Sequence, residues 1–251
     1  MTDTPPSHSA PPGDLLVGAS LFLDFDGTLV AIAERPDAVV VDESLDTLMN
    51  GLIETLQGRV AIITGRSLAE IDRIIARGRL ALGGSHGLEL RWPDGRTRAP
   101  EAPVGLAEIV AEMHALQAEH PGLIVEEKPF GAALHYRRAP AAEVECRALA
   151  ARLAERQGMT MQAGKMVFEI KAAGQDKGSA LRALMEELPM RGTRPVFIGD
   201  DETDEAAFRA ARDLGGAGIL VGPARPTSAR YRLEGVAATR DWLGQAAEAL
   251  A

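Results

Sequence analysis

Cysteine is almost absent from this chain of 251 residues, in which Cys146 is the only one. One cysteine excludes a disulfide bond within the chain and fits a reducing compartment. Because Cys146 lies in a helical pattern, we interpret it as a core residue and not as a nucleophile. Neither a disulfide-stabilised fold nor thiol catalysis is therefore expected.

The chain also lacks long apolar and long basic runs. No segment approaches the ~18–20 apolar residues of a membrane span, so no membrane segment is predicted. Lys and Arg form no long run, and the formal net charge of −9 argues against a nucleic-acid partner. Residues 1–14 are rich in Pro and Ser and lack the features of a signal peptide, so we interpret them as a disordered tail. These absences favour a cytoplasmic location.

Two aspartates, Asp24 and Asp26, stand where an apolar run ends in a Gly-Thr turn. Residues 19–23 are continuously apolar or small, which is typical of a buried strand in a parallel sheet. Ligands gather outside the carboxyl ends of such strands, so Asp24 is predicted to lie at a reaction site. At ordinary residue frequencies, D-x-D-G-T occurs by chance in well under ~1% of chains this long.

The chemistry of phosphoryl transfer explains this pattern. A carboxylate at the end of a strand can attack phosphorus and carry the phosphoryl group as an aspartyl phosphate. A second carboxyl group two positions on can protonate the leaving oxygen and then deprotonate the attacking water. Gly27 allows the backbone to approach closely and offers N–H groups to phosphate oxygens. The alternative is a turn that merely ends a strand.

Two further segments add candidate phosphate ligands. The apolar run 60–63 ends in Thr64-Gly65-Arg66, where the Thr64 hydroxyl could bind a phosphate oxygen beside a helix start. Lys177 precedes a helical pattern, and its ammonium suits a site that holds a carboxylate and a phosphate together. Taken singly, an ordinary strand-to-helix turn and a surface lysine are the better explanations of these two segments.

A dense acidic cluster follows the apolar run 195–199. Asp200 comes directly after this run, and three more carboxylates follow within four residues. Carboxylates this close repel one another unless a cation offsets them, and Mg²⁺ prefers oxygen ligands. A solvated acidic helix start explains Glu202 and Glu205 but not Asp200. The cluster therefore predicts a Mg²⁺ site.

In this order the four segments resemble the four motifs of the haloacid dehalogenase superfamily of phosphatases, over residues 21 to about 204. The resemblance implies that Asp24 is the nucleophile, Asp26 the general acid and base, and Lys177 a catalytic residue that binds the phosphoryl group. It implies further phosphate-binding positions at Gly27, Thr64, Gly65 and Arg66. The implied Mg²⁺ ligands are Asp24, Asp26 and Asp200, supported by Asp201 and Asp204.

The order of elements predicts an α/β protein with an insertion. The core is expected to be a doubly wound, mainly parallel (Rossmann-like) sheet of this superfamily, formed by residues 15–102 and 173–251. More than a hundred residues separate the second and third segments, too many for one crossover helix. Residues 103–172 are therefore predicted to form an α+β cap in the order α-β-β-α-β-β, joined to the core by hinges.

Strand alternation separates two faces of the cap sheet. Phe168 and Ile170, with Met166, are predicted to point toward the helices, whereas Lys165, Glu169 and Lys171 point the other way. Glu126 and Lys128 share a face by the same parity. A charged face suits a polyhydroxylated ligand. It is equally what any antiparallel sheet shows to water.

Several segments resemble the trehalose-6-phosphate phosphatase family: 84–89, 126–129, 135–137, 164–170 and 199–205. The resemblance implies hydrolysis of trehalose 6-phosphate, the last step of trehalose biosynthesis. It implies a sugar-binding set formed by Glu126, Lys128, Arg137, Lys165, Glu169 and, less directly, His86 and Glu89. Coupling to a trehalose-phosphate synthase would need a separate protein. A phosphatase for sucrose 6-phosphate or a glycosyl phosphate, and a catalytically silent sugar-phosphate sensor, stay open as alternatives.

Overall fold

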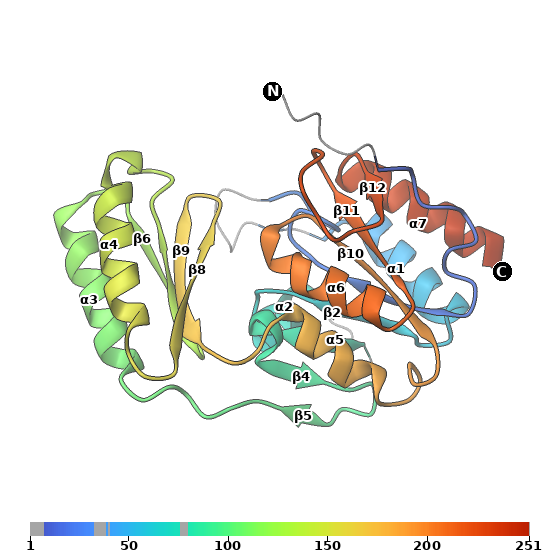
Figure 1. Ribbon diagram of the computed structural model, residues 1–251, viewed down its shortest axis with the longest axis horizontal. Coiled ribbons are helices and arrows are strands. Elements are labelled where there is room, and N and C mark those ends of the chain that lie inside the picture. The colour runs from blue at the N-terminus through green and yellow to red at the C-terminus, as the bar shows by residue number, and fades with distance from the viewer. Residues whose placement is uncertain (1–7, 33–38, 40, 76–79, 251) are drawn as a thin grey trace. The chain divides into compact units, whose positions relative to one another are not determined.

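The computed structural model describes residues 8–32, 39, 41–75 and 80–250. The chain divides into two compact units. The core unit comprises Met1–Ala99 and Asp176–Ala251, and the cap unit comprises Pro100–Gln175. Both are drawn in Figure 1. No helix in the described part of the chain is long and apolar enough to cross a membrane.

The core unit is built on an eight-stranded sheet. In sheet order its strands are β12 (Tyr231–Leu233), β11 (Ala217–Val221), β10 (Arg194–Gly199), β1 (Ala19–Leu23), β2 (Val60–Ile63), β3 (Ala81–Gly84), β4 (Glu89–Arg91) and β5 (Thr97–Arg98). The first six run parallel, and β4 and β5 join antiparallel at one edge. Parallel neighbours need crossover connections, which helices supply from β1 to β2, from β2 to β3 and from β10 to β11.

Helices cover both faces of this sheet (Figure 1). They are α1 (Glu43–Thr55), α2 (Leu68–Ile74), α5 (Lys177–Met185), α6 (Glu205–Asp213) and α7 (Val236–Leu250). Leu21 and Leu23 of β1 pack with α1, α2 and α7, whereas Phe22 packs with α5 and α6. Strands β1, β2, β3 and β11 are buried at every residue because helices cover both faces of the sheet there.

Local sequence signals start the helices. Asp42 accepts a hydrogen bond from Leu45 N at 2.8 Å and so caps α1. Leu45, Met49 and Leu52 then form the buried stripe of that helix. Ser67 caps α2 in a reciprocal capping box with Glu70, as the sequence spacing predicts.

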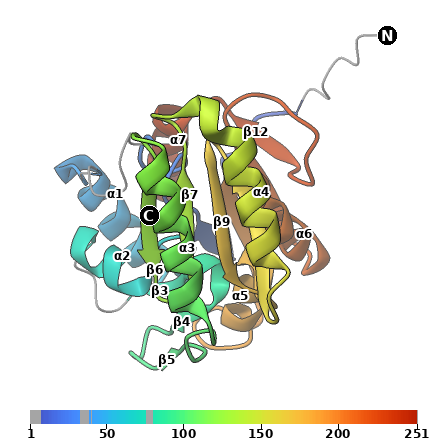
Figure 2. The same ribbon diagram turned by 90° about the vertical axis from the view of Figure 1, so that its left-hand side faces the viewer.

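The cap unit has the predicted element order and a separate core. Its elements are α3 (Leu106–Glu119), β6 (Ile124–Lys128), β7 (Gly131–His135), α4 (Glu143–Ala154), β8 (Met159–Gly164) and β9 (Val167–Ala172). The four strands pair antiparallel in the order β6-β7-β9-β8. Figure 2 shows α3 and α4 side by side across this sheet. The predicted α/β fold with an inserted α+β cap is confirmed.

The cap core lies between the sheet and its two helices. Phe168 and Ile170 of β9 are buried against this layer, together with Leu134 of β7 and Cys146 of α4. The predicted orientation of Phe168 and Ile170 agrees with this packing. The opposite face of the sheet therefore carries the alternate residues of each strand.

Part of the segment 1–14, which the composition predicts to be a disordered tail, makes hydrogen bonds with the core unit. Residues 1–7 of the predicted disordered tail lie outside the described residues. Beyond them, Ser9 O accepts a hydrogen bond from Arg232 N at 3.1 Å, and Pro11 O accepts one from Trp242 Nε1 at 3.2 Å. Proline is compatible with such a segment, because the segment's carbonyl oxygens accept the hydrogen bonds and no N–H group of a proline is needed.

Candidate active site

Neighbouring strands bring Asp24 and Asp200 together. β1 and β10 run parallel and in register, with Leu23 opposite Ile198. Asp24 follows β1 directly, and its N–H donates to Ile198 O at 2.8 Å. Asp200 follows β10 directly. Both aspartates therefore stand at the carboxyl edge of the sheet, where the sequence predicts a site.

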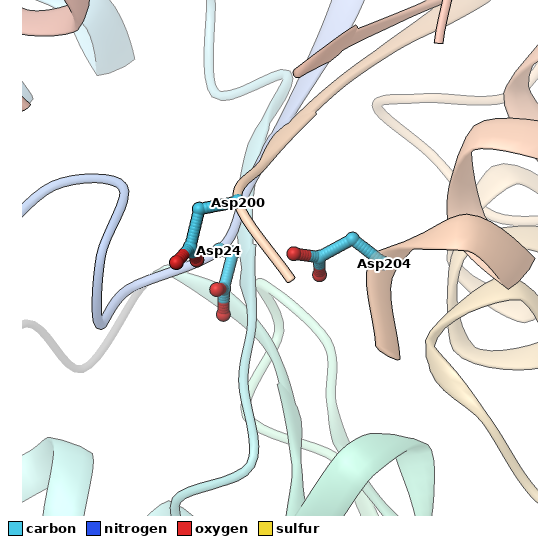
Figure 3. Close-up of side chains that lie close together, drawn as sticks. All are labelled: Asp24, Asp200 and Asp204. Atoms are coloured by element: carbon cyan, nitrogen blue, oxygen red, sulfur yellow. The ribbon is translucent and has the colours of Figure 1, made fainter. Parts of the chain in front are cut away.

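The acidic turn after β10 contributes a third carboxylate. Residues Glu202–Asp204 form a 3₁₀ turn that returns Asp204 to the end of β10. Asp201 N donates to Asp204 Oδ2 at 2.9 Å. A Cβ at position 199 would lie 2.4 Å from the Asp204 carboxyl carbon, so only glycine permits this approach. Oxygens of Asp24, Asp200 and Asp204 all lie within 4.8 Å of one another. Figure 3 shows the three side chains together.

Lys177 is the buried cation of this cluster. It is the first residue of α5, whose N-cap is Asp176. Its Nζ lies 2.8 Å from Asp24 Oδ1 and 2.6 Å from Asp204 Oδ1. The Lys177 side chain is only 3% exposed and that of Asp204 is fully buried. A lysine in this position pairs with two carboxylates. The sequence alone does not distinguish such a buried lysine from a surface lysine.

Burial and mutual repulsion shift the titration of these groups. Burial raises the pKa of Asp24 well above its ordinary value. The positive charge of Lys177 lowers this pKa, whereas the negative charges of Asp204 and Asp200 raise it further. Burial and the charge of Asp204 likewise raise the pKa of Asp200 to about 6. Burial alone would lower the pKa of Lys177, but the charges of Asp204 and Asp24 raise it above its ordinary value. The cluster holds more negative charge than one lysine balances.

The residues present fit a divalent cation. Oxygen-only donors suit Mg²⁺, which is bound through one or two carboxylates together with water and substrate phosphate. Asp200 Oδ1 is buried and finds no hydrogen-bond partner among the residues that the structure describes. An unsatisfied carboxylate oxygen is costly, and a cation would satisfy it. Asp24, Asp200 and Asp204 are therefore the residues that could hold the metal.

Gly27 keeps space beside Asp200. Its φ of +81° is in the left-handed region, and a Cβ there would lie 2.2 Å from Asp200 Oδ2. The turn is closed by a hydrogen bond from Gly27 N to Val30 O at 2.7 Å. Both the backbone conformation and the close approach require glycine at this position.

A left-handed turn places His86 over the loop that follows β2. Ser85, His86 and Gly87 have φ values of 49°, 56° and 99°. Such conformations are unfavourable for Ser and His and persist where surrounding contacts impose them. His86 N donates to Thr64 O at 2.9 Å. A Cβ on Gly65 would lie 2.6 Å from the His86 ring, so the ring and the Gly65 backbone are in direct contact.

Glu89 holds this turn in place. Its Oε2 accepts hydrogen bonds from Ser85 Oγ at 2.7 Å and from Leu68 N at 3.2 Å. The predicted pair His86 and Glu89 thus divides into two roles. His86 contacts Gly65, a predicted phosphate-binding residue, whereas Glu89 stabilises the backbone turn that carries His86.

Asp26 does not join the three carboxylates. Its two oxygens face Arg66, with Arg66 Nε at 2.7 Å from Oδ2 and Nη2 at 2.8 Å from Oδ1. Asp201 also lies apart from the cluster, because its carboxylate accepts from Glu202 N at 2.7 Å and caps the acidic turn. Among the residues described, the group able to hold a metal contains Asp204 rather than Asp26.

The polar face of the cap sheet carries a second charged cluster. Ladder pairing sets Glu126 opposite Ala133, and Ala133 opposite Glu169, in one row across three strands. Because the central residue is small, side chains from β6 and β9 meet over it. Lys128 Nζ lies 3.1 Å from Glu169 Oε2 and 3.9 Å from Glu126 Oε1. The strand parity predicted from the sequence for Glu126, Lys128 and Glu169 agrees with these contacts.

His135 belongs to this cap cluster, although the predicted sugar-binding set omits it. Its Nε2 lies 2.7 Å from Glu126 Oε2. Burial raises the pKa of Glu126, but the hydrogen bond with His135 and the charge of Lys128 outweigh burial and bring the pKa below its ordinary value. Strand parity places His135 on the face opposite to Leu134. This parity was the signal that could have added His135 to the predicted sugar-binding set.

The chain matches known proteins over most of its length. The family model for trehalose-phosphatase matches residues 22–237. The chain belongs to the trehalose-phosphatase family. It is 39% identical to trehalose-6-phosphate phosphatase of Escherichia coli (strain K12) over 231 residues, which cover 91% of this chain and 86% of that protein. It is 40% identical to a probable trehalose-phosphate phosphatase of Sinorhizobium fredii over 211 residues, 83% of this chain and 80% of that one.

Solved structures agree with the family and the fold. A trehalose-6-phosphate phosphatase related protein aligns with a TM-score of 0.76 and 28% identity, covering 89% of this chain and 94% of its own. The C-terminal domain of Candida albicans trehalose-6-phosphate phosphatase aligns with a TM-score of 0.82, covering 96% and 98% of the two chains. At 20% identity this second likeness shows the fold alone. The predicted phosphatase family and enzyme class are confirmed.

Arg137 and Lys165 lie outside the cap cluster. Lys165 is exposed in the turn between β8 and β9, not within a strand. Arg137 is also exposed, and its Nη2 donates to Lys165 O at 3.3 Å. The cap sheet therefore groups Glu126, Lys128 and Glu169 on its polar face and leaves the other two predicted residues beyond the ends of its strands. Their sugar-binding role stays a prediction.

Proposed function

We propose that this member of the trehalose-phosphatase family hydrolyses trehalose 6-phosphate to trehalose and inorganic phosphate. The observation that carries the chemistry is the buried arrangement of Lys177 between Asp24 and Asp204, beside Asp200. A nucleophilic carboxylate, a cation and further carboxylates at one sheet edge suit phosphoryl transfer. Membership of the family supports the choice of substrate.

In the first step, Asp24 attacks phosphorus. Its Oδ1 is held by Lys177, so the attacking carboxylate is already oriented before substrate arrives. The bond from Asp24 to phosphorus forms as the bond from phosphorus to the sugar oxygen breaks, and the product is an aspartyl phosphate. Asp26 gives a proton to the departing sugar oxygen.

In the second step, water attacks the phosphoryl group. Asp26 accepts a proton from this water, and the bond between phosphorus and Asp24 breaks. Thr64 Oγ1 accepts a hydrogen bond from Arg66 N at 3.2 Å, which leaves the hydroxyl hydrogen to donate to a phosphate oxygen. Backbone N–H groups after β1 and β2 are further candidate donors.

Mg²⁺ is the cofactor in this proposal, held by Asp24, Asp200 and Asp204. When bound, it supplies positive charge that lowers repulsion between the nucleophile and the phosphate and stabilises charge on the transferring group. Its removal by EDTA is expected to abolish phosphate release, and added Mg²⁺ to restore it. Activity unchanged in EDTA would exclude a metal requirement.

The cap cluster is proposed to bind the sugar. Carboxylates and an ammonium group recognise hydroxyl groups through charge-assisted hydrogen bonds. Glu126 and Lys128 of β6 and Glu169 of β9 supply these groups, with Arg137 and Lys165 beyond the strand ends. The connections between the units stay predicted hinges. Coupling to a separate trehalose-phosphate synthase likewise stays a prediction.

The test is phosphate release by the purified protein across a panel of sugar phosphates. The panel holds trehalose 6-phosphate, sucrose 6-phosphate, glucose 6-phosphate and a glycosyl phosphate, with Asp24→Asn as control. Strong preference for the trehalose ester, lost in the variant, is expected. Preference for another ester would overturn the substrate assignment, and full turnover by Asp24→Asn would overturn the aspartyl-phosphate route. Binding of trehalose 6-phosphate without turnover would identify a sensor.

A further inference from the structure

Arg66 makes a bidentate ion pair with Asp26 in the core unit. Its Nε lies 2.7 Å from Asp26 Oδ2 and its Nη2 lies 2.8 Å from Asp26 Oδ1. Parallel N–H···O bonds of this kind fix the orientation of a carboxylate as well as its distance. The family resemblance implies that Arg66 is a phosphate ligand, whereas the structure gives its guanidinium another partner.

The surroundings of Arg66 hold it toward Asp26. Its backbone N–H donates to Thr64 Oγ1 at 3.2 Å, and its carbonyl accepts from Ser85 N at 2.7 Å. The guanidinium carbon lies 5.9 Å from the centroid of the buried Phe25 ring, within the range of a cation–π contact. The Arg66 side chain is 11% exposed, whereas that of Asp26 is 32% exposed. The arginine is thus the fixed partner of the pair.

A carboxylate held in this way can still move a proton. Its two oxygens offer about four lone-pair sites, and two N–H···O bonds occupy two of them. The general acid must hold its proton within hydrogen-bond reach of the leaving oxygen, and a small misplacement lowers the rate strongly. Asp26 stands in the turn three residues beyond the end of β1, and its side chain, 32% exposed, needs a constraint to keep one orientation. A rigid guanidinium supplies that constraint.

We propose that Arg66 is the positioning residue for the general acid Asp26, and that its main role is not to bind phosphate. This inference rests on the proposed function, because it assigns Arg66 a part in protonating the sugar oxygen. In that step the proton moves from the Asp26 carboxyl group to the sugar oxygen while the phosphoryl group passes to Asp24. Arg66 itself neither gains nor loses a proton.

Two substrates with different leaving groups test the proposal. The sugar alkoxide needs a proton as it leaves, whereas para-nitrophenolate is a stable anion and needs none. For Arg66→Ala, kcat/KM with trehalose 6-phosphate is expected to fall by about 10- to 100-fold, which is part of the usual contribution of a general acid. With para-nitrophenyl phosphate, kcat/KM is expected to fall by less than about threefold. The ratio of the two values does not depend on how much of the variant is folded.

Three variants complete the experiment. Arg66→Lys keeps the charge but not the planar pair, so its ratio should shift in the same direction. Arg73→Ala removes an exposed arginine from α2 and should leave the ratio unchanged. Combined with Asp26→Asn, Arg66→Ala should add almost no further loss on the sugar substrate, since residues that act as a unit are not additive.

The opposite results are equally clear. Equal losses on both substrates, with KM raised for each, would show that Arg66 binds the phosphate and would overturn the proposal. A full additional loss in the Asp26→Asn background would overturn it as well. If the wild-type protein prefers another ester of the panel, the proposed function fails separately. The same ratio is then measured with that ester and still decides the role of Arg66.

Discussion

The sheets of the core unit and the cap unit differ in where they carry charge. In the core unit, helices cover both faces of the sheet, so β1, β2, β3 and β11 are buried throughout and the charged residues of the site stand at the strand ends. Within the cap unit, α3 and α4 pack on one face of the sheet, and charged residues lie along the opposite face. The first arrangement concentrates charge at a point, whereas the second spreads it over a surface.

This difference corresponds to two parts of one reaction. A buried point of charge suits a small group with fixed geometry, such as a phosphoryl group, because low dielectric strengthens each interaction. A surface of several charged groups suits a ligand with many hydroxyls. The core is therefore expected to act on every substrate alike, and the cap to distinguish among them. Variants in each unit test this division.

The largest effect is expected in the core, from Lys177→Met. This change leaves Asp24 and Asp204 without their buried cation, so kcat should fall by at least ~100-fold for every phosphate ester. The free energy of unfolding should fall by about 3–5 kcal/mol, because removing one partner of a buried ion pair leaves an uncompensated charge. Phosphate release and urea unfolding measure the two effects.

Arg182→Ala is the matched control for that variant. Arg182 lies on the same helix but pairs with Asp213 at the surface, at 2.7 Å. It should leave both activity and stability nearly unchanged, because exposed ion pairs contribute little. If Lys177→Met kept wild-type turnover, the cluster at the sheet edge would not be the site of chemistry.

An intermediate effect is expected in the cap, from Glu126→Gln. Loss of a carboxylate that binds sugar hydroxyls should raise KM for trehalose 6-phosphate by about tenfold, the usual size of a hydrogen bond to a charged group. KM for para-nitrophenyl phosphate, which has no sugar, should change little. Steady-state kinetics with both substrates measure the difference.

Glu127→Gln offers a control one residue away on the same strand. Glu127 has the opposite parity, and its Oε1 lies 3.0 Å from Nε2 of His114 on α3. Both substrates should therefore keep their KM values in this variant. Equal effects of the two substitutions would mean that the polar face of the cap sheet has no special part in sugar binding.

The smallest effect concerns the separate stability of the two units. The only cysteine, Cys146, is buried in the cap core, whereas both tryptophans, Trp92 and Trp242, belong to the core unit. Thiol labelling therefore reports unfolding of the cap, and tryptophan fluorescence reports unfolding of the core. The smaller unit buries less surface per residue, so its urea midpoint should be lower by up to about 1 M. Coincident transitions would show that the units unfold together.

The core site was predictable because its residues are tied to strand ends. Asp24 and Asp200 each follow an apolar run, and parallel strands bring such positions to one edge of the sheet. The sequence did not separate Asp201 from Asp204, since both belong to the same acidic segment. A 3₁₀ turn decides between them, because it directs Asp204 back over Gly199 and leaves Asp201 to cap the turn.

The cap prediction was limited by the position of one turn. Parity assigned Lys165 and Glu169 to one strand, but the chain turns at Lys165 and Met166, where Met166 has a φ of +64°. Lys165 therefore lies at the end of the hairpin, while Glu169 pairs with Lys128 across β7. Parity holds only within a continuous strand, and Gly164 was the signal in this segment for a break directly before Lys165.

The sequence by itself determined the order of elements, the strand-end aspartates and the polar face of the cap, because each follows from hydrophobic period and turn chemistry over a few residues. Only the tertiary structure decided which charges pair. Lys177 is joined to Asp24 and Asp204, and Arg66 to Asp26, across long stretches of chain. Such pairings depend on how separate loops meet at the sheet edge. Local sequence patterns do not show which of these side chains come within hydrogen-bond distance of one another.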